Sequence, residues 1–261
     1  MITRNHESRG NVKGDGQPLI RKRTVRLILS IFVSLMIAFV VVAIVVPMFG
    51  RVDEVGPRQE SAWHLWDIAF AMHDYANNHK TFPPAVVYDS HGKPLYSWRV
   101  LLLPYLQEKP LYSQFKLDEP WDSPNNKPLL AQMPHVYRTP SQYQRNEPYA
   151  THYQVFTGGG AIFEASPKAH LLSFKDIIAA DGMNKTLLVV EAAEPELWTK
   201  PEDLPYSPDR SLPQLGGLFI KKGFWAMMAD GGTRWFSMDM DEETIRAMIT
   251  WNGGETVKLP D

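Results

Sequence analysis

The sequence predicts an α+β protein in which a long helical region comes first and an antiparallel β-sheet follows. Three patterns carry this prediction: an apolar run at 27–46, a helical repeat of apolar residues at 57–78, and a two-residue alternation in the second half of the chain. A last helical pattern lies near the C-terminus. With 261 residues, 44% of them hydrophobic, the chain can bury a large core.

The apolar run from Leu27 to Val46 is interrupted only by Ser30 and Ser34. At about 1.5 Å per residue, a helix of this length spans the roughly 30 Å hydrocarbon core of a bilayer. We therefore predict a transmembrane helix at 25–48 that contacts the lipid bilayer through residues 27–46. The alternatives are a cleaved signal peptide, whose apolar region is usually shorter, and a core helix, which would have to bury every face.

The charges around this run predict the orientation of the chain. Residues 1–26 hold seven Lys or Arg against Glu7 and Asp15, a net charge of +5, so the remainder carries −7. The positive-inside rule places the predicted disordered basic tail at 1–24 in the cytoplasm. We expect a single-pass protein of the inner (cytoplasmic) membrane with an extracytoplasmic domain at 57–261. Its mildly acidic charge predicts no nucleic-acid partner.

The outer domain is predicted to begin with an amphipathic helix at 57–78. Apolar residues such as Leu65 and Ile68 recur there at intervals of three or four, and Trp63, Trp66 and Phe70 are predicted to widen the apolar face. The run at 82–84, Phe-Pro-Pro, stops this helix.

Short elements and then a sheet follow. We predict a strand at 86–88 and short helices at 111–117 and 127–133. The predicted strands of the sheet lie at 151–156, 187–191, 223–229 and 233–238. Asp230-Gly231-Gly232 between the last two indicates a hairpin, because glycine adopts the positive φ of tight turns. Asp239 or Asp241 then caps a final helix that ends near Trp251.

The residue types restrict the chemistry. The chain has no cysteine, which excludes disulfides and thiolate ligands. His64 and His73 are nine positions apart, so they lie on opposite faces of one helix and cannot share a metal within it. The other histidines, His135 among them, lack metal-binding spacing. We therefore predict no catalytic residue, cofactor or metal site, and interpret Asp181-Gly182 and Asp230-Gly231 as structural turns, with Ca²⁺ at these turns as the alternative.

Tryptophan and carboxylate residues leave two binding hypotheses. The candidate binding surface for glycans or other solutes comprises Trp121, Asp122, Asn125, Asn126 and Trp198. Burial of the tryptophans in the core is the alternative. Scattered carboxylates could also supply the pair that an envelope hydrolase needs, but the sequence cannot pair them in space and contains no nucleophile elbow.

Several short motifs resemble one family along residues 65–255. They include Phe-Pro-Pro-Ala at 82–85, Ser-Trp-Arg-Val-Leu-Leu-Leu-Pro-Tyr-Leu at 97–106, Glu-Pro-Trp-Asp-Ser-Pro-Asn-Asn at 119–126, and Trp-Thr-Lys-Pro-Glu-Asp-Leu at 198–204. These motifs are similar to those of domain of unknown function family 1559, pilin-like (prepilin-type) proteins abundant in planctomycetes. The resemblance implies a pilin-like fold, in which a long N-terminal helix continues out of the membrane and packs on an antiparallel sheet.

The chain departs from the family pattern at two places. Family members often carry a prepilin signal, with Gly before the cleavage point and Glu at the fifth mature position, and neither is present here. The usual His before the terminal Asp-Gly is also missing. We therefore expect a retained anchor rather than a filament subunit, with a non-enzymatic structural or interaction role in the cell envelope. Envelope proteins and glycans are the expected partners.

Overall fold

The computed structural model describes residues 18–140, 148–219 and 222–255. The chain divides into two compact units, Met1–Asp53 and Glu54–Asp261. Most of the predicted tail, residues 1–17, lies outside the described residues. Residues 18–24 were predicted to be disordered but belong to helix α1 (Pro18–His79). Proline fits the first turn of a helix, and adding residues to an existing helix is easier than starting one.

The described part of the first unit contains the predicted apolar segment. Val25–Ala43 is helical, and its length and composition would allow it to cross a membrane. Every side chain of this segment is exposed. Such a segment is compatible with a membrane anchor or with a signal sequence.

The second unit is built on a four-stranded antiparallel sheet in the order β3-β5-β7-β8. Its strands are β3 (Ala150–Gln154), β5 (Leu187–Leu197), β7 (Gly223–Met228) and β8 (Thr233–Ser237). The predicted hairpin joins β7 to β8. Gly231 adopts a φ of +87°, and Asp230 Oδ1 accepts the Gly232 N–H at 2.8 Å. The prediction of an α+β chain with an N-terminal apolar helix and an antiparallel sheet is confirmed.

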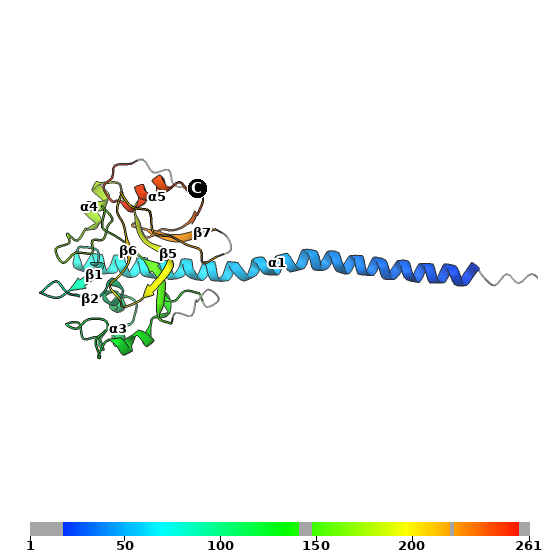
Figure 1. Cartoon of the computed structure of the whole chain (residues 1–261), viewed down its shortest axis with the longest axis horizontal. Coiled ribbons are helices and arrows are strands. Elements are labelled where there is room, and N and C mark those ends of the chain that lie inside the picture. The colour runs from blue at the N-terminus through cyan, green and yellow to red at the C-terminus, as the bar shows by residue number, and fades with distance from the viewer. Residues whose placement is uncertain (1–17, 141–147, 220–221, 256–261) are drawn as a thin grey trace, which may run out of the picture. The chain divides into compact units, whose positions relative to one another are not determined.

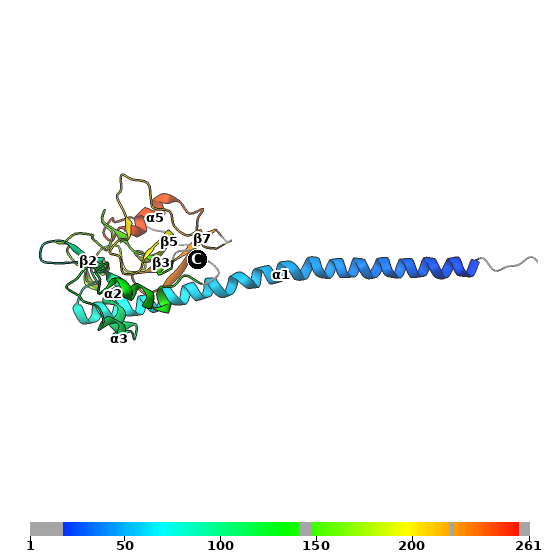
Figure 2. The ribbon, with the colours of Figure 1, turned by 60° about the horizontal axis from the view of Figure 1, so that its bottom comes forward.

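Side chains alternate between the two faces of this sheet, and each face has its own core. Along β7, Met227 belongs to the core that includes the buried residues of α1, whereas Ala226 and Met228 belong to a second core. Met248 and Ile249 of α5 (Glu242–Ile249) complete the second core. Figures 1 and 2 show the second unit with α1 along one side of the sheet and α5 on the other.

Helix α1 presents only one apolar face to the core. Leu65 and Ile68 are completely buried, but Trp63, Trp66 and Phe70 are each more than half exposed. The prediction that these three aromatic residues widen the buried face was wrong. At about 100° per residue they point away from the side occupied by Leu65 and Ile68.

Smaller elements surround the sheet and connect its strands. The predictions covered the strand at 86–88, short helices near 111–117 and 127–133, and the final helix, whose N-cap Asp241 accepts the Thr244 N–H at 3.1 Å. The short helices α2, η1, η3 and α4 and the strands β2, β4 and β6 were not predicted, because two to six residues carry little periodic signal. In chain order, the smaller elements before α5, predicted or not, are β1 (Val86–Tyr88), β2 (Pro94–Ser97), α2 (Trp98–Leu101), η1 (Leu103–Tyr105), α3 (Lys109–Tyr112), η2 (Lys127–Gln132), η3 (His135–Tyr137), β4 (Phe156–Thr157), α4 (Phe174–Ala179) and β6 (Leu204–Pro205).

Candidate functional site

Two residues one helical turn apart on α1 begin the candidate site. Glu60 and His64 occupy positions i and i+4, so their side chains lie on the same side of the helix. His64 is buried and Glu60 is partly exposed. The fixed helix therefore presents a carboxylate and an imidazole as neighbours.

A distant segment brings a third residue to this pair. His135 begins η3, and Tyr137 in the same short helix is completely buried. The Tyr137 hydroxyl donates a hydrogen bond to the Arg99 carbonyl at 2.9 Å, which fixes the segment to the core. His135 itself remains on the surface, where 73% of its side chain is exposed.

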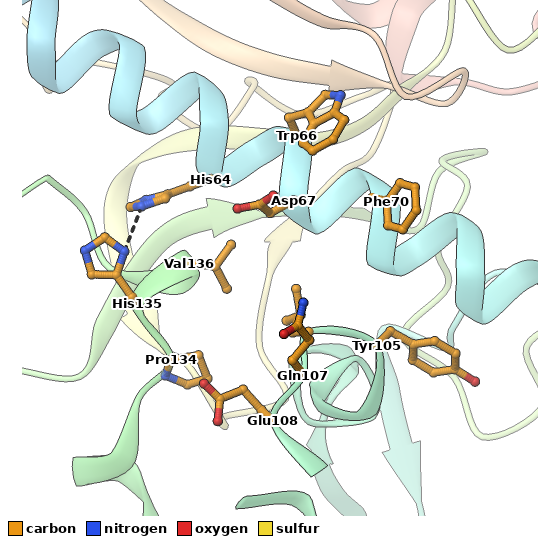
Figure 3. A pocket seen from close by; sticks show the side chains of 11 residues that line it. His64, Trp66, Asp67, Phe70, Tyr105, Gln107, Glu108, Pro134, His135 and Val136 are labelled. Atoms are coloured by element: carbon orange, nitrogen blue, oxygen red, sulfur yellow. Dashed lines mark hydrogen bonds between the residues drawn. The ribbon is translucent and has the colours of Figure 1, made fainter.

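The three side chains form a compact cluster, referred to below as the Glu60–His64–His135 cluster. His64 Nε2 lies 3.2 Å from His135 Nδ1, and His135 Nε2 lies 3.7 Å from Glu60 Oε1. One ligand atom from each residue lies within 4.8 Å of the others. Figure 3 shows the His64 ring of α1 beside the His135 ring, and the planes of the two rings are nearly perpendicular, at 89°.

A backbone carbonyl orients the His64 ring. His64 Nδ1 lies 3.1 Å from the Arg138 carbonyl oxygen, which can only accept a hydrogen bond. In the neutral ring Nδ1 therefore carries the proton, and the lone pair of Nε2 points toward His135. Burial lowers the pKa of His64, and positive charge on the nearby His135 lowers it further.

Hydrogen bonds connect this cluster to a carboxyl group inside the core. The Tyr153 hydroxyl lies 3.4 Å from His64 Nδ1 and 2.7 Å from Ser61 Oγ. Ser61 donates a hydrogen bond to Glu191 Oε1, and the Trp225 N–H donates to Glu191 Oε2 at 2.7 Å. Burial raises the pKa of Glu191 to about 7, against the opposing effect of these hydrogen bonds.

A cleft of about 460 Å³ lies beside the cluster. His64 and His135 line it together with aromatic and acidic side chains of α1, η1 and the turn that follows (Figure 3). Trp66 and Phe70 stack on each other with their ring centroids 6.0 Å apart. The residues of the aromatic and acidic lining are Trp66, Asp67, Phe70, Tyr105 and Glu108. A cleft with this lining offers flat apolar surface and hydrogen-bond acceptors to a small solute.

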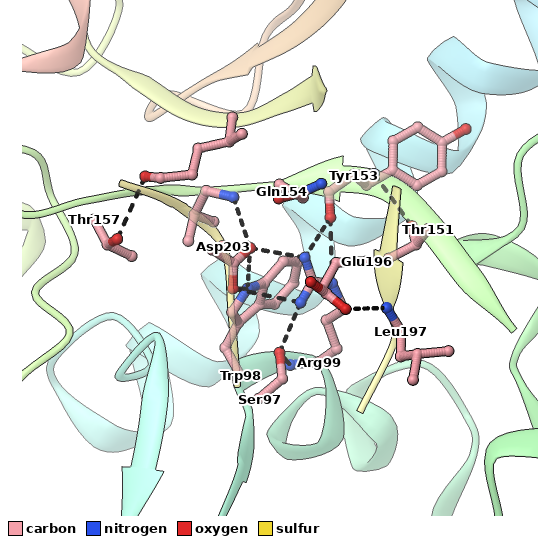
Figure 4. Close-up of polar contacts among 12 residues, drawn as sticks. Ser97, Trp98, Arg99, Thr151, Tyr153, Gln154, Thr157, Glu196, Leu197 and Asp203 are labelled. Atoms are coloured by element: carbon pink, nitrogen blue, oxygen red, sulfur yellow. Dashed lines mark hydrogen bonds and ion pairs between the residues drawn. The ribbon is translucent and has the colours of Figure 1, made fainter. Parts of the chain in front are cut away.

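A second polar cluster, around Arg99 and Asp203, is a structural element. The Arg99 guanidinium contacts Asp203 at 2.7 Å and donates to the Tyr153 carbonyl at 2.7 Å, and both charged side chains are buried (Figure 4). Burial raises the pKa of Asp203, whereas Arg99 and the Val155 N–H oppose that shift. Each of these charged groups already has protein partners, which indicates a structural role. The pair ties α2 to β3 and to the segment before β6.

The predicted binding surface was wrong for two of its five residues. Trp198 is completely buried, and its Nε1–H donates to the Leu130 carbonyl at 3.1 Å. Asn126 is also completely buried, and its amide side chain bonds to backbone groups, including both the N–H and the carbonyl of Lys116. These polar atoms stabilise the loop and are not available to a ligand. Trp121, Asp122 and Asn125 retain exposed surface.

The predicted structural turns place their aspartates against backbone groups. The Asp181 carboxylate accepts the N–H groups of Gly253 and Gly254, at 2.8 and 2.9 Å. Gly182 and Gly231 have φ values of +91° and +87°, which favour glycine. Asp230 caps its own hairpin. Ca²⁺ binding at these turns stays the alternative to this prediction.

The sequence did not indicate the Glu60–His64–His135 cluster. His64 and His135 are 71 positions apart and follow no known ligand spacing. The i, i+4 spacing of Glu60 and His64 was the only local signal, and that spacing is common on helices. His73 Nε2 lies 2.8 Å from the Ala229 carbonyl oxygen.

Comparison with known proteins shows the family of the chain. The model of a family described as "Protein of unknown function (DUF1559)" matches residues 58–257. No curated protein and no solved structure matches the chain.

Proposed function

The chain belongs to domain of unknown function family 1559. We propose that it is a single-pass membrane protein that presents a pilin-like interaction domain outside the cytoplasm. The proposed role in the cell envelope is structural or binding rather than enzymatic. It includes retention of the N-terminal helix as an anchor.

One observation carries this proposal: the side chains of Val25–Ala43 are exposed, and all of them except Arg26, Ser30 and Ser34 are apolar. Burying a large apolar side chain contributes about 1.5–3 kcal/mol, so leaving this whole segment in water would cost on the order of tens of kcal/mol. A bilayer removes that cost. The basic residues at the N-terminal end of the segment, Arg21, Lys22, Arg23 and Arg26, favour a cytoplasmic N-terminus.

Anchoring can be tested with charges at the centre of the segment. The double variant Val33→Arg, Ile37→Arg should shift the full-length protein from the membrane fraction to the soluble fraction, because each arginine costs about 2.5–3.5 kcal/mol at the bilayer centre. The conservative double variant Val33→Ile, Ile37→Leu should remain in membranes. Alkaline extraction followed by immunoblotting measures the distribution.

Topology and retention need separate measurements. Protease added to spheroplasts should degrade the second unit while a cytoplasmic marker stays intact, and the mature protein should still begin before residue 25. A protected second unit would contradict the orientation. An N-terminus after residue 43 in the mature protein would show that the segment is a cleaved signal sequence.

A second candidate function, binding of a glycan or another solute, is favoured by the cleft beside α1. Trp66 and Phe70 expose stacked rings there, next to Asp67 and Glu108. Binding sites for sugars commonly combine such an aromatic surface with carboxylate hydrogen-bond acceptors. Trp66→Ala or Phe70→Ala should weaken binding about threefold to tenfold in calorimetry of a solute identified on a glycan or metabolite array.

Trp63→Ala is the matched control for this experiment. Trp63 is similarly exposed on α1 but does not line the cleft. If Trp63→Ala weakened binding as much as Trp66→Ala, the solute would bind outside the cleft. Absence of any bound solute across the arrays would remove this second function. The envelope hydrolase stays an alternative, because the fold does bring a carboxylate and two histidines together.

A further inference from the structure

We propose that Glu60, His64 and His135 bind one divalent transition-metal ion of the zinc class. This inference goes beyond anchoring and does not depend on the placement of the chain in a membrane. The site draws two ligands from one turn of α1 and the third from η3, so a bound ion would link the helix to the loop region that packs beside it.

The spacing of the two histidines fits a shared ion. Zn–N bonds of about 2.0–2.1 Å in a tetrahedral site place two nitrogen ligands roughly 3.3 Å apart. His64 Nε2 and His135 Nδ1 are separated by 3.2 Å. The two nitrogen atoms therefore already have the separation of neighbouring ligands.

The third ligand needs only a local adjustment. All three ligand atoms lie within 4.8 Å of one another, and the side chains of Glu60 and His135 are 37% and 73% exposed. Exposed side chains can change rotamer without disturbing a core. His64, the buried ligand, is held in place by the helix.

The surroundings of His64 prepare it as a metal ligand. Metal-binding histidines usually donate the N–H of their other ring nitrogen to a carbonyl or carboxylate, which fixes the tautomer and the ring orientation. The Arg138 carbonyl, 3.1 Å from His64 Nδ1, occupies that position. The lone pair of Nε2 is thereby directed out of the core toward His135.

A proton shared among the three residues explains the geometry less well than a metal ion does. A charged His135 would donate from Nδ1 to His64 and from Nε2 to Glu60. The first distance, 3.2 Å, suits a hydrogen bond, but the second, 3.7 Å, is too long for one. The cluster is therefore incompletely paired, whereas an ion would satisfy all three groups.

The ligand set also selects the kind of metal. Two imidazoles and one carboxylate suit Zn²⁺, Cu²⁺ or Ni²⁺, whereas Ca²⁺ and Mg²⁺ prefer sites made entirely of oxygen. Three protein ligands leave a fourth position of a tetrahedral ion open. His64 and His135 both line the cleft, so water or a cleft-bound solute could fill that position.

The test uses the full-length, tag-free protein in detergent. We expect Zn²⁺ to bind with 1:1 stoichiometry in calorimetry, and Co²⁺ to give the visible absorption of a tetrahedral site with nitrogen and oxygen ligands. His135→Ala and Glu60→Gln should each weaken Zn²⁺ binding at least about tenfold. His91→Ala is the matched control, because His91 is an exposed histidine outside the cluster and its loss should leave the affinity unchanged.

Because His135 and Glu60 are exposed, both variants should keep the circular dichroism spectrum and melting temperature of the metal-free wild-type protein. His64→Gln, in which the buried side chain changes, serves only as supporting evidence. Absence of 1:1 Zn²⁺ binding in the wild-type protein would overturn the proposal. Unchanged affinity in a folded His135→Ala variant would overturn it as well.

Discussion

Glu191 is a carboxyl group in the core between α1 and the sheet, held by Ser61 and the Trp225 N–H. Removing its charged form from water raises its pKa from 4.5 to about 7. The folded protein therefore binds a proton between these two pH values, where the unfolded chain has lost it. Stability contributed by this proton is complete below pH 4.5 and is lost as the pH rises through 7.

We expect the contribution of Glu191 to fall by about 3 kcal/mol between pH 4.5 and pH 7, because one pKa unit corresponds to about 1.4 kcal/mol. Glu191→Gln mimics the protonated side chain and should remove this part of the pH dependence. Urea unfolding at several pH values measures the difference between wild type and variant. Parallel curves for the two proteins would contradict the raised pKa.

At the scale of elements, the part of α1 in the second unit has two different faces. Leu65, Ile68 and Met72 are completely buried, in the core between α1 and the sheet. Trp66 and Phe70 lie on the solvent side and line the cleft. Large aromatic residues on an exposed helix face contribute little to folding, which leaves them free for binding.

Two substitutions on α1 should separate these faces. Leu65→Ala should lower the free energy of unfolding by about 2–5 kcal/mol, because it leaves a cavity in the core. Trp66→Ala should change it by less than about 0.5 kcal/mol, as expected for an exposed side chain. Denaturant titration measures both values. A large loss in Trp66→Ala would mean that the exposed face supports the fold.

At the scale of the whole molecule, the chain consists of two compact units. Among the described residues, the buried ones begin at Ser61, so both cores of the second unit are built from that unit alone. No residue of the apolar segment Val25–Ala43 belongs to either of these cores.

We therefore expect residues 54–261, expressed without the first unit, to fold as a soluble protein. The fragment should be monodisperse in size-exclusion chromatography and should unfold cooperatively on heating, since a single domain with a complete core does so. The same fragment carrying Leu65→Ala is the destabilised control. An aggregated or non-cooperative wild-type fragment would show that the first unit supports the fold.

Local patterns in the sequence determined the apolar segment, the strands of the sheet and the turn that joins β7 to β8. Each of these depends on residues within a few positions, such as Asp230 and Gly231 in the hairpin. The family was also recognisable, because its short motifs keep their order along the chain.

Only the tertiary structure decided which distant side chains meet. It buried Trp198 and Asn126, which the sequence had suggested for a binding surface, and it placed His135 beside His64. Neither outcome has a periodic signal, because a contact across 71 positions depends on how α1 and η3 are packed against the same core. The sequence thus determined the main helices and strands, and packing decided the candidate site.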